Sequence, residues 1–428
     1  MKTREFLPRK PAPEAPPGAD RLWVVSELYY PEQSATGYYM TRIAEGLASE
    51  LHVRVLCGQP TYSARGVRAP VDEIRNGVHI HRCSSTTLDK NRLLKRSINL
   101  LTLSVAVVVQ SLIRFRRGDR VLVVTNPPSL PFLVSLACKW RGAECVLLIH
   151  DVFPDALVAT GILKTRSFLV RSLRWLNGLL YRSVSHIVVI GRDMQELVRE
   201  RLPVNSAPPI SVIPNWADAD FIVPLPRADN PFLRRWGIEG KFVVQSSGNM
   251  ARSSAIETMA GAAELLRGDT AFHFVFIGSG VKKPWLEKFV RERDLSCVDI
   301  VSPRPRDLLC DLLNAADIAL LGVVAGMRGV SVPSRLYNIL AAGKPVVAIA
   351  EPGSEVARVV LEESIGWVVD PGDTHRLAGV LAEARSRPDL LRPMGERARA
   401  AAEQSYRYGH SLELFRSIFT RRADGDAV

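Results

Sequence analysis

Two ionisable side chains stand directly after an apolar run in the first half of the sequence. The run at 145–149 is followed at once by His150 and Asp151. An apolar run of this length predicts a buried strand, and polar groups at a strand's carboxyl end point into the crevice where α/β proteins bind ligands. His150 and Asp151 are therefore the candidate catalytic residues, for acid–base chemistry or for holding a substrate hydroxyl. A purely structural hydrogen bond is the alternative that this pair alone leaves open.

Glycines and cations follow two of the strands expected in the second half. The segment S-S-G-N-M-A-R contributes Gly248, Asn249 and Arg252. The segment F-I-G-S-G-V-K-K contributes Gly278 and Lys283. Glycine lets a backbone approach a ligand closely, and a guanidinium can hold a phosphate through two hydrogen bonds. These strand ends therefore predict a binding site for a diphosphate.

A third strand end of the second half precedes a helix in V-S-V-P-S-R-L-Y-N-I-L-A-A-G-K-P. Pro333 and Ser334 open this helix, whose free N–H groups and dipole would stabilise a phosphate. Ser334 and Arg335 could add side-chain donors. An ordinary strand-to-helix junction of any α/β protein is the alternative. Gly37 follows the first expected strand, in a loop where its backbone could also approach a ligand.

Other familiar chemistries lack their motifs. Neither a G-x-x-x-x-G-K-[ST] loop nor a G-x-G-x-x-G after a strand occurs, which disfavours P-loop NTPases and dinucleotide oxidoreductases. Six cysteines without a C-x-x-C pair disfavour zinc and disulfides and favour a reducing compartment. Asp218 and Asp220 form a D-x-D, but in the expected linker. We expect no metal and no cofactor.

The elements that must position these residues alternate between short β-rich runs and helix-length segments. The pattern predicts an α/β protein with two doubly wound parallel sheets, since 428 residues exceed one ordinary core. Prolines and lost periodicity near 215–230 mark a boundary. The expected parts are a disordered Pro-rich tail at 1–20, a first domain at 21–215, a linker at 216–229, a second domain at 230–405, and a C-terminal helix and tail at 406–428.

The positive charge lies mainly in the first half, which has a net charge of +10 over residues 1–220 against +2 for the rest. The segment 92–117 has an apolar middle of sixteen residues with basic ends, too short to span a bilayer. The segment 166–182 is typical of a basic amphipathic helix on an anionic membrane; a core helix is the alternative. Nucleic acid is disfavoured because no recognition module is visible. The residues expected at the membrane are Arg92, Lys95, Arg96, Arg171, Arg174 and Trp175.

From Arg21 to its end the chain resembles glycosyltransferase family 4, whose members are retaining enzymes with two Rossmann-like domains in the GT-B fold. The resemblance lies in L-Y-Y-P-E-Q-S-A-T-G, H-D-V-F-P-D, I-P-N-x-x-D, G-N-x-x-R, F-I-G-S-G, N-A-A-D-I-A-L, and V-P-S-R-L-Y-N-I-L-A-A-G-K-P-V with P-G-S-E-V. P-S-[KR]-x-Y is most similar to the branch that builds bacterial surface polysaccharides, including colanic acid and O-antigen transferases of amino sugars.

The resemblance implies that the second domain binds a nucleotide sugar, expected to be UDP-linked, with Arg252, Lys283 and Arg335 at the diphosphate. The first domain, through Gly37 and His150–Asp151, would hold the acceptor and the reacting face of the sugar. A final helix would return to the first domain. The implied acceptor is an undecaprenyl-diphosphate-linked saccharide, which places the enzyme in the cytoplasm, peripheral on the inner face of the plasma membrane.

The sequence departs from the family where two glutamates, separated by seven residues, usually contact sugar and ribose. Val330 and Asn338 occupy these positions here. Asn338 could still hydrogen-bond a ribose hydroxyl, and Glu355 in P-G-S-E-V is our candidate for the sugar contact. Two other functions stay open: a nucleotide-sugar epimerase of the same fold, and a membrane-docked assembly subunit without catalysis.

Overall fold

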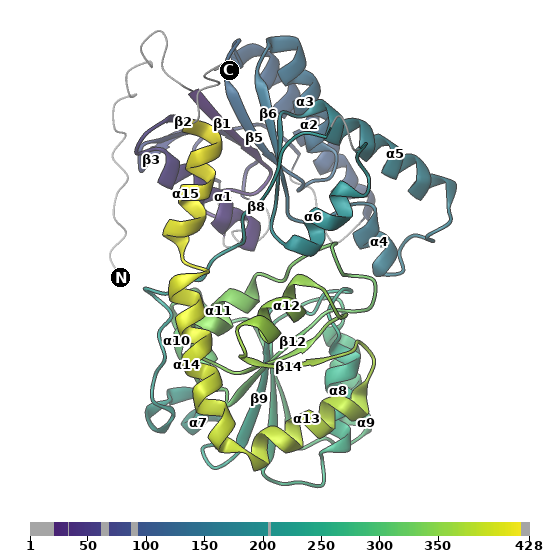
Figure 1. The fold of residues 1–428 in the computed structure, drawn as a ribbon, viewed down its shortest axis with the longest axis vertical. Coiled ribbons are helices and arrows are strands. Elements are labelled where there is room, and N and C mark those ends of the chain that lie inside the picture. Colours follow the sequence, from purple (N-terminus) through teal and green to yellow (C-terminus); the bar gives the residue numbers. More distant parts are fainter. Residues whose placement is uncertain (1–20, 33, 61–67, 87–92, 204–206, 421–428) are drawn as a thin grey trace, which may run out of the picture.

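The computed structural model describes residues 21–32, 34–60, 68–86, 93–203 and 207–420. The tail expected to be disordered, 1–20, and the last eight residues lie outside this range. Two α/β domains follow one another along the long axis of the molecule, and the chain ends on the first (Figure 1).

The N-terminal domain is built on an eight-stranded sheet in the order β3-β4-β2-β1-β5-β6-β7-β8. All neighbours pair in parallel except β3 and β4, an antiparallel edge that the sequence did not predict. The central strands are buried on both faces, as their uninterrupted apolar runs require. The strands are β1 (Arg21–Ser26), β2 (His52–Cys57), β3 (Asp72–Arg75), β4 (Val78–Arg82), β5 (Arg120–Val124), β6 (Glu144–Ile149), β7 (His186–Val189) and β8 (Ile210–Val212).

Six helices connect these strands. The steps from β4 to β5, β5 to β6 and β6 to β7 run in one direction across the sheet, whereas the step from β1 to β2 runs in the other. Because such crossovers are right-handed, α2, α3 and α5 cover one face and α1 covers the opposite face. The helices are α1 (Ala35–Leu47), α2 (Leu93–Arg114), α3 (Leu130–Arg141), α4 (Asp155–Ala159), α5 (Phe168–Ser183) and α6 (Arg192–Arg199).

The C-terminal domain repeats this design on six parallel strands in the order β11-β10-β9-β12-β13-β14. These are β9 (Phe242–Ser247), β10 (Phe272–Ile277), β11 (Val298–Val301), β12 (Ile318–Gly322), β13 (Val346–Ile349) and β14 (Gly366–Val369). The helices are α7 (Pro231–Trp236), α8 (Ile256–Leu265), α9 (Lys283–Glu292), α10 (Leu309–Asn314), α11 (Arg335–Ala341), α12 (Glu355–Glu362) and α13 (Thr374–Ser386).

The strand order reverses between β1 and β5 in one sheet and between β9 and β12 in the other. Ligands of such sheets bind outside the carboxyl ends of the strands at the point of reversal. The residues singled out in the sequence follow these strands and their neighbours. The fold therefore gathers them where the two domains meet.

The last two helices, α14 (Pro388–Gln404) and α15 (Tyr408–Thr420), carry the chain back to the N-terminal domain (Figure 1). The Tyr408 hydroxyl donates to the Arg42 carbonyl of α1 at 2.8 Å, and the Arg42 guanidinium lies over the Tyr408 ring. The linker and this return path run side by side, because Ala217 pairs with Arg407. None of the helices within the described ranges is long and apolar enough to cross a bilayer.

Candidate active site

The segment after β6 and the segment before α11 join the two domains. The Val152 N–H donates to the Val330 carbonyl at 2.9 Å, and Asp151 forms an isolated antiparallel bridge with Ser331. Val330 itself is buried. The position where the resemblance implied a glutamate is therefore occupied by a buried apolar side chain at the domain junction.

Two glycine loops interlock at the carboxyl ends of β9 and β10. The Met250 N–H donates to the Ser279 carbonyl at 2.8 Å. Gly248 and Gly278 have φ values of +139° and +150°, which side chains rarely adopt. A Cβ at Gly278 would collide with the Gly248 carbonyl oxygen. Glycine at these strand ends therefore makes the packing of the two loops possible.

The Arg335 side chain places a positive charge against the two glycine loops, which we call the glycine cradle and which contain Gly248 and Gly278. A Cβ added to Gly248 would lie 3.0 Å from Arg335 Nη1, so the guanidinium covers the loop. Nη2 donates to the Gly322 carbonyl at 3.2 Å, and the buried Nε has no partner. Burial lowers the pKa of Arg335 from 12.5 to about 10. Arg335 is half-buried as a whole, and among the described residues no carboxylate pairs with its guanidinium, which leaves this positive charge available to an anion.

Helix α11 is shorter than the sequence predicts, since it has seven residues. Its dipole can add less than that of a long helix, so the Arg335 side chain supplies the main positive charge here. Ser334 precedes the helix and lies near the Tyr39 phenol of α1, whose hydroxyl donates to the Trp216 carbonyl at 3.2 Å. Asn338 is half-buried on the same helix.

The other two predicted cations differ from Arg335. Arg252 is exposed beside the β9 loop, and no contact of its guanidinium is found in the described part of the chain. Lys283 lies 3.4 Å from Ser302 Oγ and 3.7 Å from Glu287, so its ammonium is already engaged. Its neighbour Lys282, which we did not predict, instead ties the β10 loop to the β9 loop and α8 by donating to the Ser254 carbonyl and to the Glu257 carboxylate, both at 2.7 Å.

His150 and Asp151 directly follow β6, and the pKa of each side chain is shifted from its ordinary value. Burial lowers the pKa of His150 to about 4, so the imidazole is neutral at physiological pH. Burial raises the pKa of Asp151, and a hydrogen bond with Ser331 partly offsets this. Thr125 Oγ1 accepts the two backbone N–H groups at 3.1 and 3.4 Å. Thr125 therefore holds the main chain that carries these two side chains.

Gly37 serves packing in the first turn of α1. Its N–H donates to Ser34 Oγ at 3.2 Å, and a Cβ would come within 2.9 Å of the Glu32 carbonyl oxygen. The glycine lets the β1 loop fold tightly onto the helix. This explains the residue without a ligand, and the donor contact predicted for Gly37 stays a prediction.

Glu355 has a role other than the one we expected. Its carboxylate accepts the Arg192 backbone N–H at 2.8 Å and the Arg192 Nε at 3.1 Å, and Arg192 also pairs with Glu362. Beside it, buried Asp193 accepts N–H groups from Gly329 and Glu355 at 2.8 and 3.0 Å. Both oxygens of Glu355 thus bind the two domains together, and we do not assign them to the sugar.

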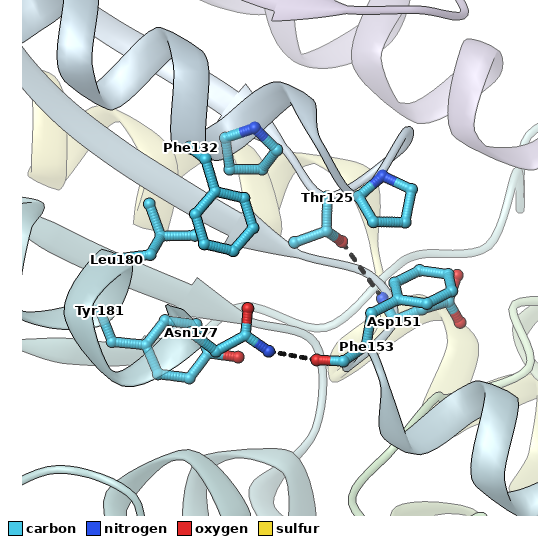
Figure 2. Close-up of a pocket in the computed structure, with 9 residues that line it drawn as sticks. Thr125, Phe132, Asp151, Phe153, Asn177, Leu180 and Tyr181 are labelled. Atoms are coloured by element: carbon cyan, nitrogen blue, oxygen red, sulfur yellow. Dashed lines mark hydrogen bonds between the residues drawn. The ribbon is translucent and has the colours of Figure 1, made fainter. Parts of the chain in front are cut away.

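A small pocket in the N-terminal domain has Asp151 at its wall (Figure 2). Phe153, Leu180 and Tyr181 line it together with Phe132 from α3. The pocket therefore lies between α3 and α5 and combines aromatic walls with one carboxylate. The sequence did not indicate this pocket, because its residues come from separate segments and no single motif contains them.

The membrane residues predicted on α5 divide into two groups. Arg171 and Trp175 are exposed. Arg174 instead turns inward to Asp155 at 2.7 Å, and Arg201 pairs with the same carboxylate at 2.8 Å. Arg174 is thus a structural ion pair rather than a surface cation. Arg92 and the side chains of Lys95 and Arg96 lie outside the described residues.

Within the described part of the chain, no group of three or more His, Cys, Asp and Glu side chains could hold a metal ion. The positive charge near the glycine cradle comes instead from Arg335. Asp218, part of the D-x-D considered above, pairs with Arg306 at 2.9 Å.

Two family models match consecutive parts of the chain. Residues 34–216 match the glycosyl transferase 4-like domain, and residues 231–401 match glycosyl transferases group 1. The two matched regions meet at the linker between the domains. Each domain therefore corresponds to one family module.

Named relatives extend over nearly the whole length. The chain is 35% identical to the probable glycosyltransferase WbjE of Pseudomonas aeruginosa, covering 92% of this chain and 96% of that protein. It is 27% identical to the putative colanic acid biosynthesis glycosyl transferase WcaI of Escherichia coli, covering 85% and 92%.

Among solved structures, Anabaena HepE in complex with UDP-glucose has the same fold, with a TM-score of 0.71 over 94% of this chain and 99% of that one at 13% identity. The two facing α/β domains and their matches confirm the fold expected from the sequence. The chain belongs to the glycosyltransferases of the GT-B fold.

Proposed function

We propose that this protein transfers a sugar from a nucleoside diphosphate to a lipid-linked saccharide, with retention of configuration and without a metal ion. The expected donor is a UDP-linked N-acetylated amino sugar, and the expected acceptor carries undecaprenyl diphosphate. The expected place is the inner face of the plasma membrane. The observation that carries the proposal is half-buried Arg335, whose guanidinium has no carboxylate partner among the described residues and lies against Gly248.

The chemistry follows from that charge. The bond between the anomeric carbon and the diphosphate oxygen breaks, so negative charge grows on the diphosphate. A fixed cation at that oxygen stabilises the transition state more than the bound donor, which lowers the barrier. Arg335 would hold the diphosphate, with Arg252 reaching it from the exposed rim and Ser334 and Asn338 beside the nucleoside.

The acceptor side would use the end of β6. The acceptor hydroxyl attacks the anomeric carbon on the face that the diphosphate leaves, and its proton passes to the departing diphosphate. Asp151 would orient that hydroxyl as a hydrogen-bond acceptor. Neutral His150 could donate to a sugar hydroxyl, because burial keeps its pKa near 4.

Comparison supports the donor class. The neighbouring HepE structure holds UDP-glucose, and WcaI is named for colanic acid biosynthesis. These statements concern those proteins, and their bearing on this chain is the proposal.

A thermal-shift screen tests the donor. UDP at a hundred times its Kd should stabilise the protein by about 2.7 kcal/mol, and excess EDTA should leave this unchanged. Product analysis should then show transfer only when a lipid-linked acceptor is present. An epimerised nucleotide sugar formed from donor alone would replace the proposal with an epimerase, and no response to UDP, GDP or dTDP sugars would refute it.

A further inference from the structure

One short segment of the C-terminal domain lies against the N-terminal domain and leads to the glycine cradle. Residues 329–332 follow β12, and Arg335 is the first residue of α11 beyond them. We call these four residues the docking segment. Only Pro333 and Ser334 separate it from Arg335, and proline restricts the backbone between the two. A shift of the docking segment is therefore passed on to the guanidinium.

The end of β6 holds the middle of the docking segment. The Val152 N–H donates to the Val330 carbonyl at 2.9 Å, and Asp151 forms an antiparallel bridge with Ser331. Val332, at the end of the segment, is buried. The N-terminal domain thus contacts the segment with the same residues that we assign to the acceptor side.

Asp193 on α6 holds the other end of the docking segment. Its Oδ2 accepts the Gly329 N–H at 2.8 Å and the Glu355 N–H at 3.0 Å, both from the C-terminal domain. Its Oδ1 accepts the Met194 N–H at 2.7 Å. The side chain is buried, so water does not compete for these bonds. A carboxylate can accept from all three donors, whereas an amide would turn its NH2 group toward at least one of them.

The backbones on the two sides of this contact approach as closely as glycine allows. Gly329 has a φ of +71°, and a Cβ there would lie 2.8 Å from the Asp193 carbonyl oxygen. On the opposite side, a Cβ at Gly191 would lie 2.8 Å from a methyl carbon of Val332. The docking segment therefore has little freedom to move while α6 is in place.

Charged pairs join α6 and α12 at the surface around this buried contact (Figure 1). Arg192 pairs with Glu362 at 2.8 Å, and Glu196 pairs with Arg358 at 2.8 Å. Both glutamates are exposed, and exposed ion pairs contribute little to stability. Asp193 differs from them because it is buried and because its partner belongs to the docking segment.

We propose that Asp193 is a positioning residue for sugar transfer: from the N-terminal domain it fixes the docking segment, and through it the Arg335 guanidinium, relative to the end of β6. This inference rests on the proposed transferase function, which places the leaving diphosphate on one domain and the acceptor on the other. Reaction between groups on two domains requires that the domains be aligned. Asp193 provides this alignment through the Gly329 N–H and not by contact with a substrate.

Kinetics of Asp193→Asn test this role, with the UDP sugar that stabilises wild type in the thermal-shift screen as donor. At saturating donor kcat should fall about 100-fold, the usual effect of displacing reacting groups by about 1 Å. Calorimetry should still show one UDP bound per chain, with a Kd that changes far less than kcat. A loss of UDP stoichiometry in parallel with the rate would mean a merely structural role, and a wild-type kcat would equally overturn the proposal.

Glu196→Gln is the matched control for this variant. It removes an exposed pair between the domains from the same helix, so kcat should stay within about twofold of wild type. A fall in kcat as large as that of Asp193→Asn would overturn the proposal, because any contact between the domains would then serve as well as Asp193.

Gly329→Ala disturbs the same contact from the other domain. Its Cβ should push the docking segment away from α6 and lower kcat about 100-fold as well. Because the two changes break one contact, the double variant with Asp193→Asn should lose about as much as either single variant. Losses that multiply would show that the two residues act separately, which would overturn the proposal.

Hydrogen exchange of wild type with UDP bound needs no variant. The Gly329 amide should exchange slowly, and an unprotected amide would overturn the proposal even if the variants failed to fold. The outcomes also separate this inference from the function on which it rests. A wild type that transfers no sugar would refute the transferase, whereas an active wild type beside an equally active Asp193→Asn would refute the positioning role alone.

Discussion

Replacing Arg335 by methionine should make the free protein more stable and the enzyme inactive. Methionine keeps a long unbranched side chain but removes the charge. In wild type half-buried Arg335 lies with its guanidinium against Gly248 and has no carboxylate partner within the described chain, and only the Gly322 carbonyl accepts from it. The folded free protein therefore holds a charge that it solvates poorly.

The magnitude follows from the pKa of Arg335. Burial lowers it from 12.5 to about 10. Each pKa unit corresponds to about 1.4 kcal/mol, so desolvation of the charged form costs up to about 3 kcal/mol. Removing the charge should recover part of this, which for a domain of this size raises the melting temperature by roughly 5 °C. Loss of one oriented donor should lower kcat/KM about 100-fold or more.

The assay is thermal unfolding of Arg335→Met with and without UDP, together with initial rates of sugar transfer. The expected signature is a higher melting temperature without ligand and no UDP-induced rise. Arg252→Met is the control: its exposed side chain should change the free protein by less than about 0.5 kcal/mol. If Arg335→Met unfolded at a lower temperature, or kept the UDP response, the interpretation of Arg335 as an anion-binding residue would be refuted.

Three further predictions concern other parts of the site. His150 is buried and neutral in the folded protein, with a pKa of about 4. As pH falls from 6.5 to 4, the free energy of unfolding of wild type should drop by up to about 3 kcal/mol, because only the unfolded state gains the proton in that range. Denaturant unfolding of His150→Gln over the same pH range should lack this loss, and a profile unchanged from wild type would contradict the assignment. Glu355→Gln should weaken the contact between the domains, so the radius of gyration in solution scattering should increase and the affinities for UDP and for a UDP sugar should fall together. A loss of affinity for the UDP sugar alone would instead support the sugar contact that we first predicted for Glu355. Gly278→Ala should abolish UDP binding and lower the free energy of unfolding by about 2 kcal/mol or more. The control Gly118→Ala, at a glycine with positive φ and no neighbour near its Cβ position, should lower it by about 1 kcal/mol and leave UDP binding intact. Similar losses of stability in both variants would mean that backbone conformation alone matters.

Sequence reasoning succeeded where one segment carries its own signal. The apolar runs predicted the strands, and the residues after them were expected to lie together, because parallel strands end at a common edge. Gly248, Gly278 and Arg335 do lie together. The antiparallel β3 was missed because its alternating polar residues resemble a loop.

The failures involve partners distant in sequence. Glu355 pairs with Arg192, which lies 163 residues away in the sequence. Arg174 pairs with Asp155 on another helix, and helical periodicity alone does not say which helices face each other. Periodicity marks which residues share a helix face without saying which face meets solvent. The exposed apolar side chains of α2 were likewise compatible with either a buried or an interfacial helix until the packing order was known.

The paired crossing of the chain at Ala217 and Arg407 determines how the two halves can move. The linker after the first domain and the segment that returns from the second lie far apart in sequence. The Ala217 N–H donates to the Tyr406 carbonyl at 2.9 Å and holds the two segments together, so two paired strands of chain connect the domains. Such a paired connection bends easily in one plane but resists twisting. We therefore expect the nucleotide product to be released by a hinge opening that keeps the two domains aligned. Each new donor would then meet the same residues of the opposite domain when the hinge closes.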